Sequence, residues 1–182
     1  MTKSTLPAQS TRNYPSIFRA FETPAYRAVW PAGVCFYSTR WMHLYLLGWW
    51  VLGLTDSAFK VALVGFCITL PLFILGPFGG LLADSKRRKL ILKLTQILSL
   101  AAAVTMAVCL NIIELPYWYA YPVASAVGTA WALDRPTRQS IMLDLHGRVG
   151  VVNALALESA AQNTARMAGP AFAGLLILFA GV

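Results

Sequence analysis

Long apolar runs separated by short charged segments constrain the fold of this chain more than any other feature. Counted between clusters of charged residues, the runs cover about residues 29–54, 61–83, 90–112, 117–133 and 152–181. An apolar α-helix needs about 20 residues to cross the hydrocarbon core of a bilayer. The runs therefore predict an all-α, polytopic membrane helix bundle of about five transmembrane helices within residues 29–182, preceded by a tail of residues 1–28.

The composition argues against a soluble domain. Hydrophobic residues make up 58% of the chain and charged residues only 12%, against about 25% charged residues in a typical soluble domain. The net charge of +8 does not indicate a nucleic-acid partner, because the cations are confined to the tail and to short loops. We therefore expect the lipid bilayer to surround most of the chain.

The basic residues are distributed unequally between the two ends of the apolar runs. One side carries twelve of them: Lys3, Arg12, Arg19, Arg27, Lys86, Arg87, Arg88, Lys89, Lys93, Arg135, Arg138 and Arg148. The opposite side has Lys60 alone. By the positive-inside rule this asymmetry predicts a multi-pass protein of a plasma membrane, expected to be a bacterial inner membrane, with a cytoplasmic amino terminus. In the tail, Ile17, Phe18 and Phe21 beside arginines predict a short interfacial helix, with a disordered tail as the alternative.

The loop after the second run has a distinctive sequence, Gly80-Leu-Leu-Ala-Asp84-Ser-Lys-Arg-Arg-Lys89. It resembles the signature loop between helices 2 and 3 of the major facilitator superfamily, a family of secondary transporters. In that family the loop is a conformational latch between the two halves in the outward-facing state, and the resemblance assigns this role to Gly80, Asp84, Arg88 and Lys89. The chain departs from the family at Ser85, where an arginine is usual. The alternative is a charge run that only sets topology and contains one incidental acid.

A second polar segment, Asp134-Arg-Pro-Thr-Arg-Gln139, follows the fourth run. Proline cannot continue a helix comfortably and restricts the residue before it, so the segment predicts a bend that closes the fourth helix. We interpret four of its residues as a cytoplasmic gate: Asp134, Arg135, Pro136 and Arg138.

Further motifs downstream narrow the resemblance. Gly128, Asn153, Asn163 and Arg166, together with the sequence from Gly169 to Gly174, resemble the branch that includes enterobactin-type siderophore exporters and macrolide efflux pumps. Gly169, Pro170 and Gly174 also match part of the glycine-proline motif in helix 5 of antiporters, although Ala173 replaces one of its glycines. The alternative for this helix-packing motif is a proline kink packed by small residues.

Charged residues deep within the runs indicate a polar cavity. Arg40 and Arg166 lie about eleven and fourteen residues into their runs, or about 16 to 21 Å at ~1.5 Å per residue, near mid-bilayer. An arginine there costs at least about 2.5 kcal/mol in lipid, so it is expected to face water or a partner. We therefore predict a cavity for substrate and protons lined by Arg40, His43, Glu158, Asn163 and Arg166. Two cations favour an anionic or catecholate-like substrate, and Glu158 or His43 is the candidate proton carrier. The alternative is a structural arginine-glutamate pair.

The resemblance to the major facilitator superfamily implies a proton-coupled exporter of a small amphipathic or anionic compound that works by alternating access. The sequence has no zinc-protease or phosphate-loop motif, so we expect no enzyme, no catalytic residue, no metal and no cofactor. The family uses two six-helix halves, and we expect an incomplete chain: the amino-terminal half of the fold, ending before helix 6, with the carboxy-terminal half as its partner. The alternative is a non-transporting membrane scaffold or a split-transporter subunit, which leaves the two deep arginines unexplained.

Overall fold

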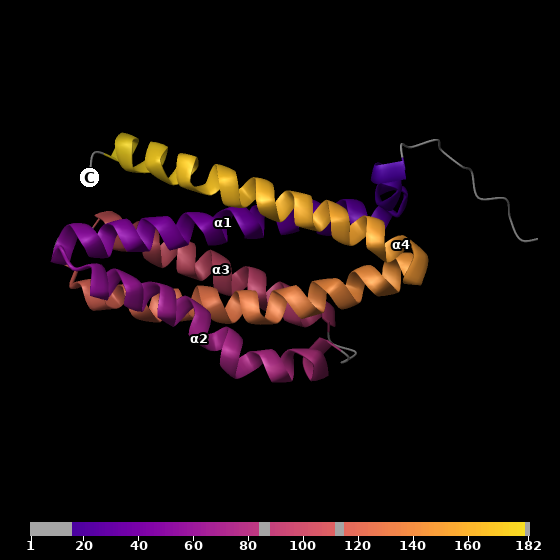
Figure 1. Cartoon of the computed structure of the whole chain (residues 1–182), viewed down its shortest axis with the longest axis horizontal. Helices are drawn as coiled ribbons and strands as arrows, with labels where there is room; N and C mark the ends of the chain where they lie inside the picture. Colours follow the sequence, from indigo (N-terminus) through magenta and orange to yellow (C-terminus); the bar gives the residue numbers. More distant parts are fainter. Residues whose placement is uncertain (1–15, 84–87, 112–114, 181–182) are drawn as a thin grey trace, which may run out of the picture.

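The computed structural model describes residues 16–83, 88–111 and 115–180. These residues form short 3-10 helices η1 (Ser16–Glu22) and η2 (Tyr117–Tyr119) and α-helices α1 (Pro24–Thr55), α2 (Ala58–Ala83), α3 (Arg88–Asn111) and α4 (Ala120–Ala180). There is no strand in the described ranges, and the predicted all-α fold class is confirmed. Figure 1 shows the long helices packed side by side in alternating directions, so that consecutive passes run along the same axis.

Local signals explain where the first long helix begins and ends. Pro24 occupies the first turn of α1, where its missing N–H would have no helical partner in any case. Asp56 ends the helix in the left-handed conformation, with φ of 45°, and its N–H donates to the Leu52 carbonyl over 2.8 Å. The chain then turns at once into α2, which starts at Ala58.

Helix α4 differs most from the sequence prediction. The backbone stays helical through Pro136, and only Gly147, with φ of 62° and ψ of −176°, leaves helical geometry. Two contacts support the helix around the proline: Thr137 Oγ1 donates to the Leu133 carbonyl over 2.7 Å, and Arg138 pairs with Asp134 one turn earlier. The bend therefore lies eleven residues beyond the predicted proline, at a glycine that tolerates positive φ.

Gly147 divides α4 into a first arm, residues 120–146, and a second arm, residues 148–180. The two arms run in opposite directions on either side of the bend, so α4 contributes two passes to the bundle (Figure 1). The bend, the start of α3 and η1 lie at one end of the bundle, and the turn between α1 and α2 lies at the other (Figure 1).

The 3-10 helix η1 docks onto the bend of α4. The Ala20 N–H donates to Asn153 Oδ1 over 3.2 Å, and His146 Nε2 lies 3.1 Å from the Ala20 carbonyl oxygen. Ala20 is buried there with Tyr26 and Met142 in a small apolar cluster. Phe21 of the tail packs against Tyr26 and Trp30 of α1, while Phe18 remains exposed.

Two stretches of the described chain are long and apolar enough to cross a membrane by themselves, Ala58–Pro77 in α2 and Arg88–Val108 in α3. Both expose large apolar side chains outward, including Phe66 and Phe73 on α2 and Leu100 on α3. Many large apolar side chains exposed on two helices are unusual for a protein in water. Such exposure fits helices that face lipid.

Two glycines set the closest helix contacts. A Cβ added to Gly128 of α4 would collide with the Ile68 carbonyl oxygen of α2, and one added to Gly169 would lie 2.7 Å from Trp41 Cβ of α1. Such small residues let helix backbones approach closely in lipid. Gly128 therefore allows α2 to pack closely against the first arm of α4, and Gly169 allows the second arm to pack closely against α1.

Candidate functional site

A cluster of buried ionisable side chains joins α1 to both arms of α4. It consists of Tyr37 from α1, Asp134 and Arg138 from the first arm, and Glu158 from the second arm, and we call it the buried charge cluster. Asp134 is 0% exposed, Arg138 2% and Glu158 7%. Burying charged groups to this degree costs free energy unless they are paired or hydrogen-bonded, so the stability of the fold depends on each partner in the cluster.

Arg138 is fully engaged within the cluster. Its Nε donates to Asp134 Oδ2 over 3.0 Å, its Nη2 to Asp134 Oδ1 over 3.2 Å, and its Nη1 to the Val29 carbonyl over 3.0 Å. This fork-to-fork geometry is the strongest form of arginine-carboxylate pair. Thr95 of α3 adds a hydroxyl 3.3 Å from Asp134 Oδ1. The pair therefore ties three helices together.

Glu158 has a different environment from Asp134. Tyr37 donates its hydroxyl proton to Glu158 Oε2 over 2.6 Å, but Glu158 Oε1 is buried and has no hydrogen-bond partner among the described residues. Gly33 on α1 makes room for both charged groups, since a Cβ there would lie 2.8 Å from Arg138 Nη1 and 3.4 Å from Glu158 Oε1. Arg138 thus lies beside Glu158 without an ion pair to it.

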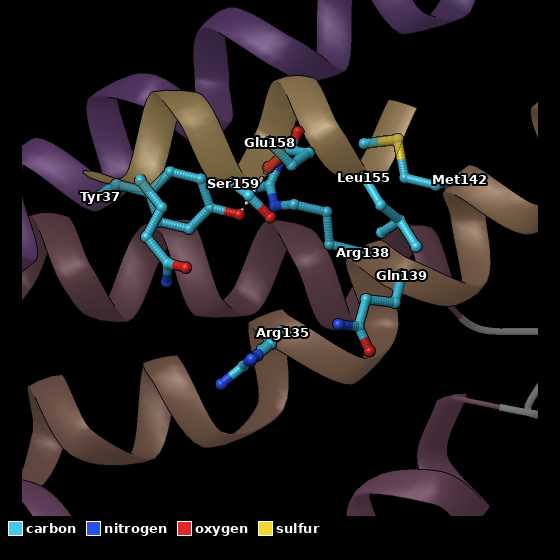
Figure 2. Close-up of a pocket in the computed structure, with 9 residues that line it drawn as sticks. Tyr37, Arg135, Arg138, Gln139, Met142, Leu155, Glu158 and Ser159 are labelled. Atoms are coloured by element: carbon cyan, nitrogen blue, oxygen red, sulfur yellow. Dashed lines mark hydrogen bonds between the residues drawn. The ribbon is translucent and has the colours of Figure 1, made fainter. Parts of the chain in front are cut away.

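The cluster borders a pocket between α1 and the two arms of α4. The pocket encloses about 390 Å³ of empty space including its open mouth. Figure 2 shows the Tyr37 hydroxyl, Glu158 and Arg138 converging on it, while Arg135 extends away from them. Its lining is mostly polar: Tyr37, Arg135, Arg138, Gln139, Met142, Leu155, Glu158, Ser159 and Gln162.

A second group of side chains alternates arginine with tryptophan on the same helices. The Arg40 guanidinium carbon lies 3.6 Å from the ring centroid of Trp131 and 4.7 Å from that of Trp41. Arg135 lies 6.0 Å from the same Trp131 ring, and Arg166 lies 5.3 Å from the same Trp41 ring. These distances suit cation-π contacts. We call these five residues the arginine-tryptophan column: Arg135, Trp131, Arg40, Trp41 and Arg166.

The residues predicted to line one cavity fall into four environments. Arg40 and Arg166 share the column, whereas Glu158 belongs to the buried charge cluster. His43 is 4% exposed, and its Nδ1 lies 2.7 Å from the Thr39 carbonyl oxygen of its own helix. Asn163 is exposed on the second arm. The structure therefore brings together the two arginines but not the whole predicted set.

The predicted gate residues also separate. Asp134 and Arg138 point inward as an ion pair, while Arg135 is exposed beside Trp131 and Pro136 is half-buried. Of the helix-packing motif, Gly169 contacts Trp41, and Pro170 continues the helix. No atom in the described chain lies within 4 Å of a Cβ added at Gly174.

Part of the predicted latch lies outside the described residues. This applies to Asp84, while Gly80 lies in α2 and Lys89 is exposed at the start of α3. Arg88 forms an ion pair with Asp144 of α4, an exposed acid close to the bend. Sequence reasoning missed Asp144, because a pair between residues 56 positions apart leaves no local signal.

Sequence reasoning also missed Tyr37 and Trp131. The spacing of Trp131 and Arg135, one helical turn apart, was legible as a neighbouring pair on one helix face. The contact of Tyr37 with Glu158 joins residues 121 positions apart and could be found only from the packed helices.

Comparison with known proteins gives one family. Residues 15–182 match the model of the transmembrane secretion effector family, a major facilitator group. The staphyloferrin A transporter of Staphylococcus aureus is 28% identical over 141 residues, which cover 76% of this chain and 35% of that protein. An uncharacterized MFS-type transporter, YfiS, of Bacillus subtilis is 30% identical over 138 residues, which cover 75% of this chain and 32% of that protein. The chain therefore spans about a third of the length of the curated relatives it matches. No solved structure shows a significant match.

Proposed function

Because this chain belongs to the transmembrane secretion effector family of the major facilitator superfamily, we propose that it forms part of a proton-coupled exporter of a small amphipathic or anionic compound. It is a membrane protein of a transporter family, as its relatives are. In this proposal the rest of the transporter supplies a second half, and the two halves rock to give alternating access to a site between them. The lipid bilayer and a small-molecule substrate are its other partners.

We further propose a bacterial inner-membrane location with the amino terminus in the cytoplasm. The positive-inside rule supports this orientation. Arg27 lies in the first turn of α1, Arg88 begins α3 and Arg148 follows the break at Gly147, and these three points of the chain lie at one end of the bundle (Figure 1). Lys60 lies beside Tyr117, near the turn between α1 and α2. This segregation is what a single cytoplasmic face would require.

The observation that carries the proton coupling is the orphaned oxygen of Glu158. A buried carboxylate oxygen without a partner has room for a proton, and Glu158 also borders the pocket through which a proton would arrive. The groups that face it are Tyr37 from α1 and Arg138 and Asp134 from the first arm of α4. His43 is the weaker candidate, because it is buried away from the pocket lining.

In the proposed cycle, protonation of Glu158 removes the negative charge beside Arg138. The electrostatic attraction between the second arm of α4 and Arg138 then weakens, while the Arg138 pair with Asp134 stays intact. Loss of the proton restores the attraction. Glu158 would thereby link a proton to the contact between the two arms and α1, which is the kind of differential interaction that alternating access needs.

Transport in everted membrane vesicles tests this proposal with the complete gene product. Staphyloferrin A, the compound named for a relative, and carboxyfluorescein, an amphipathic anion, serve as probes. We expect uptake of at least one probe that a protonophore abolishes. Glu158→Gln should lose the dependence on the proton gradient, whereas His43→Gln should keep it. Uptake of neither probe by the unaltered protein, or a gradient dependence that survives Glu158→Gln, would contradict the proposal.

A further inference from the structure

We infer that the arginine-tryptophan column is an anion-binding site for an organic compound carrying more than one carboxylate. The inference rests on the proposed transport function and names the substrate class of that transporter. Its main observation is a chain of three guanidinium groups held by two indole rings and drawn from α1 and both arms of α4.

The column contains donors but no acceptor. The ion pairs among the described residues are those of Arg88 with Asp144 and Arg138 with Asp134, so none involves the three arginines of the column. Arg40 Nε, Trp41 Nε1 and Trp131 Nε1 are all buried without a hydrogen-bond partner in the part of the chain that the structure describes. Buried donors of this kind normally have a partner. The missing partner must supply acceptors.

The nearby acids are unavailable to the column. Asp134 precedes Arg135 in sequence, yet both of its oxygens accept from Arg138 on the other side of the helix. Glu158 accepts from Tyr37 through Oε2 within the buried charge cluster, and no ion pair in the described residues joins its unpartnered Oε1 to an arginine of the column. Three like charges linked through two rings therefore have no internal counter-ion in the described chain. Their mutual repulsion is relieved by a bound anion.

The geometry favours several carboxylates over one. Arg40 and Arg166 lie on the same Trp41 ring, and Arg40 and Arg135 lie on the same Trp131 ring, so each ring joins two of the three cations. A guanidinium binds a carboxylate through two parallel hydrogen bonds, and indole faces pack the carbon skeleton between them. A ligand with carboxylates spaced along a short chain can engage successive arginines.

The positions of the arginines add a second argument. Arg135 and Arg166 are exposed and Arg40 is half-buried, although Arg40 and Arg166 sit deep within their helices. Charged side chains at such depth in membrane proteins face a water-filled cavity or a partner and mark substrate pathways. The column thus presents accessible guanidinium groups where a substrate can reach them.

Tricarballylate, a simple tricarboxylate, and its trimethyl ester are the probes that test the inference. Binding to the purified complete gene product is followed by tryptophan fluorescence and by calorimetry. We expect tricarballylate to bind, more weakly as ionic strength rises, and the ester not to bind. Arg40→Gln and Arg166→Gln should each weaken binding by about tenfold, because each removes charge-assisted hydrogen bonds. Arg40→Lys should fall between, since lysine cannot form the bidentate pair.

Arg27→Gln is the matched control, because Arg27 is exposed on α1 outside the column and donates to the Phe21 carbonyl. Each variant is first checked for the elution profile and thermal transition of the unaltered protein. The inference is overturned if tricarballylate does not bind, if the ester binds equally well, or if folded Arg40→Lys and Arg166→Gln proteins bind like the unaltered one. Tricarballylate binding without any proton-linked transport would instead overturn the proposed function and leave the site standing.

Discussion

The buried charge cluster and the arginine-tryptophan column are built from the same helices, but their arginines lie in opposite environments. Arg138 of the cluster has an acid, a backbone carbonyl and almost no exposure. Arg40 of the column has two aromatic rings, no acidic partner within the described residues, and partial exposure. An arginine whose hydrogen-bond donors all have partners within the protein holds helices together, whereas an arginine with unpartnered donors can bind a ligand. Substitutions should separate the two regions by what they damage, stability in the cluster and binding in the column.

The largest expected effect is that of Asp134→Ala. It leaves Arg138 buried at 2% exposure without its carboxylate, which costs about 3 to 5 kcal/mol in the free energy of unfolding. Unfolding of the chain in mixed micelles, followed by circular dichroism, measures this. The double variant Asp134→Ala with Arg138→Met should recover most of the loss, because it removes the stranded charge. A single variant as stable as the unaltered chain would show that the pair does not hold the helices.

A smaller effect is expected for Gly33→Ala. The added Cβ would lie 2.8 Å from Arg138 Nη1, so a guanidinium tied at every nitrogen must shift, at a cost of ~2 kcal/mol. Gly53→Ala is the control on the same helix, since nothing in the described chain lies within 4 Å of a Cβ there. It should leave stability unchanged or raise it slightly, because alanine favours the helix. Equal stabilities for the two alanine variants would mean that Gly33 does not make room for Arg138.

Tyr37→Phe should destabilise the cluster less. It removes the hydroxyl that donates to Glu158 Oε2 and leaves both carboxylate oxygens of Glu158 without a partner, which costs ~1.5 kcal/mol. The same unfolding measurement applies, with Tyr45→Phe as control, because Tyr45 is exposed on α1. If Tyr37→Phe is no less stable than Tyr45→Phe, the hydrogen bond contributes nothing net and Glu158 has another source of stabilisation.

The smallest effect is expected for removal of the ion pair between Arg88 and Asp144. This pair is more exposed than the buried charge cluster, and within the described chain its arginine has an acidic partner, unlike the arginines of the arginine-tryptophan column. The Asp144 side chain is 61% exposed, and exposed pairs contribute less than ~1 kcal/mol. Asp144→Asn should therefore change the unfolding free energy only slightly, and less as salt is added. A loss as large as that of Asp134→Ala would show that the pair acts in the fold like the buried one.

The helices were predictable because their signals are local. Apolar runs of membrane length, Pro24 in a first turn and the spacing of Asp134 and Arg138 one helical turn apart can all be read from neighbouring residues. The position of the bend was not predictable in the same way. Pro136 carries the stronger sequence signal for a helix end, yet hydrogen bonds of Thr137 and Arg138 keep the helix intact there, and the chain bends at Gly147.

The sequence alone determined that this chain is an all-α membrane protein of the major facilitator superfamily, with Arg40 and Arg166 placed deep in it. Hydropathy, helix periodicity and motif spacing depend on residues close in the chain, and these suffice for such conclusions. Only the tertiary structure decided that Arg40 and Arg166 share the Trp41 ring and that Glu158 instead joins Tyr37 and Arg138. Those contacts depend on how the helices are rotated and packed against one another. Gly33 and Gly169 help to set this packing, because each allows close approach to a residue more than a hundred positions away in the sequence, Arg138 and Trp41 respectively.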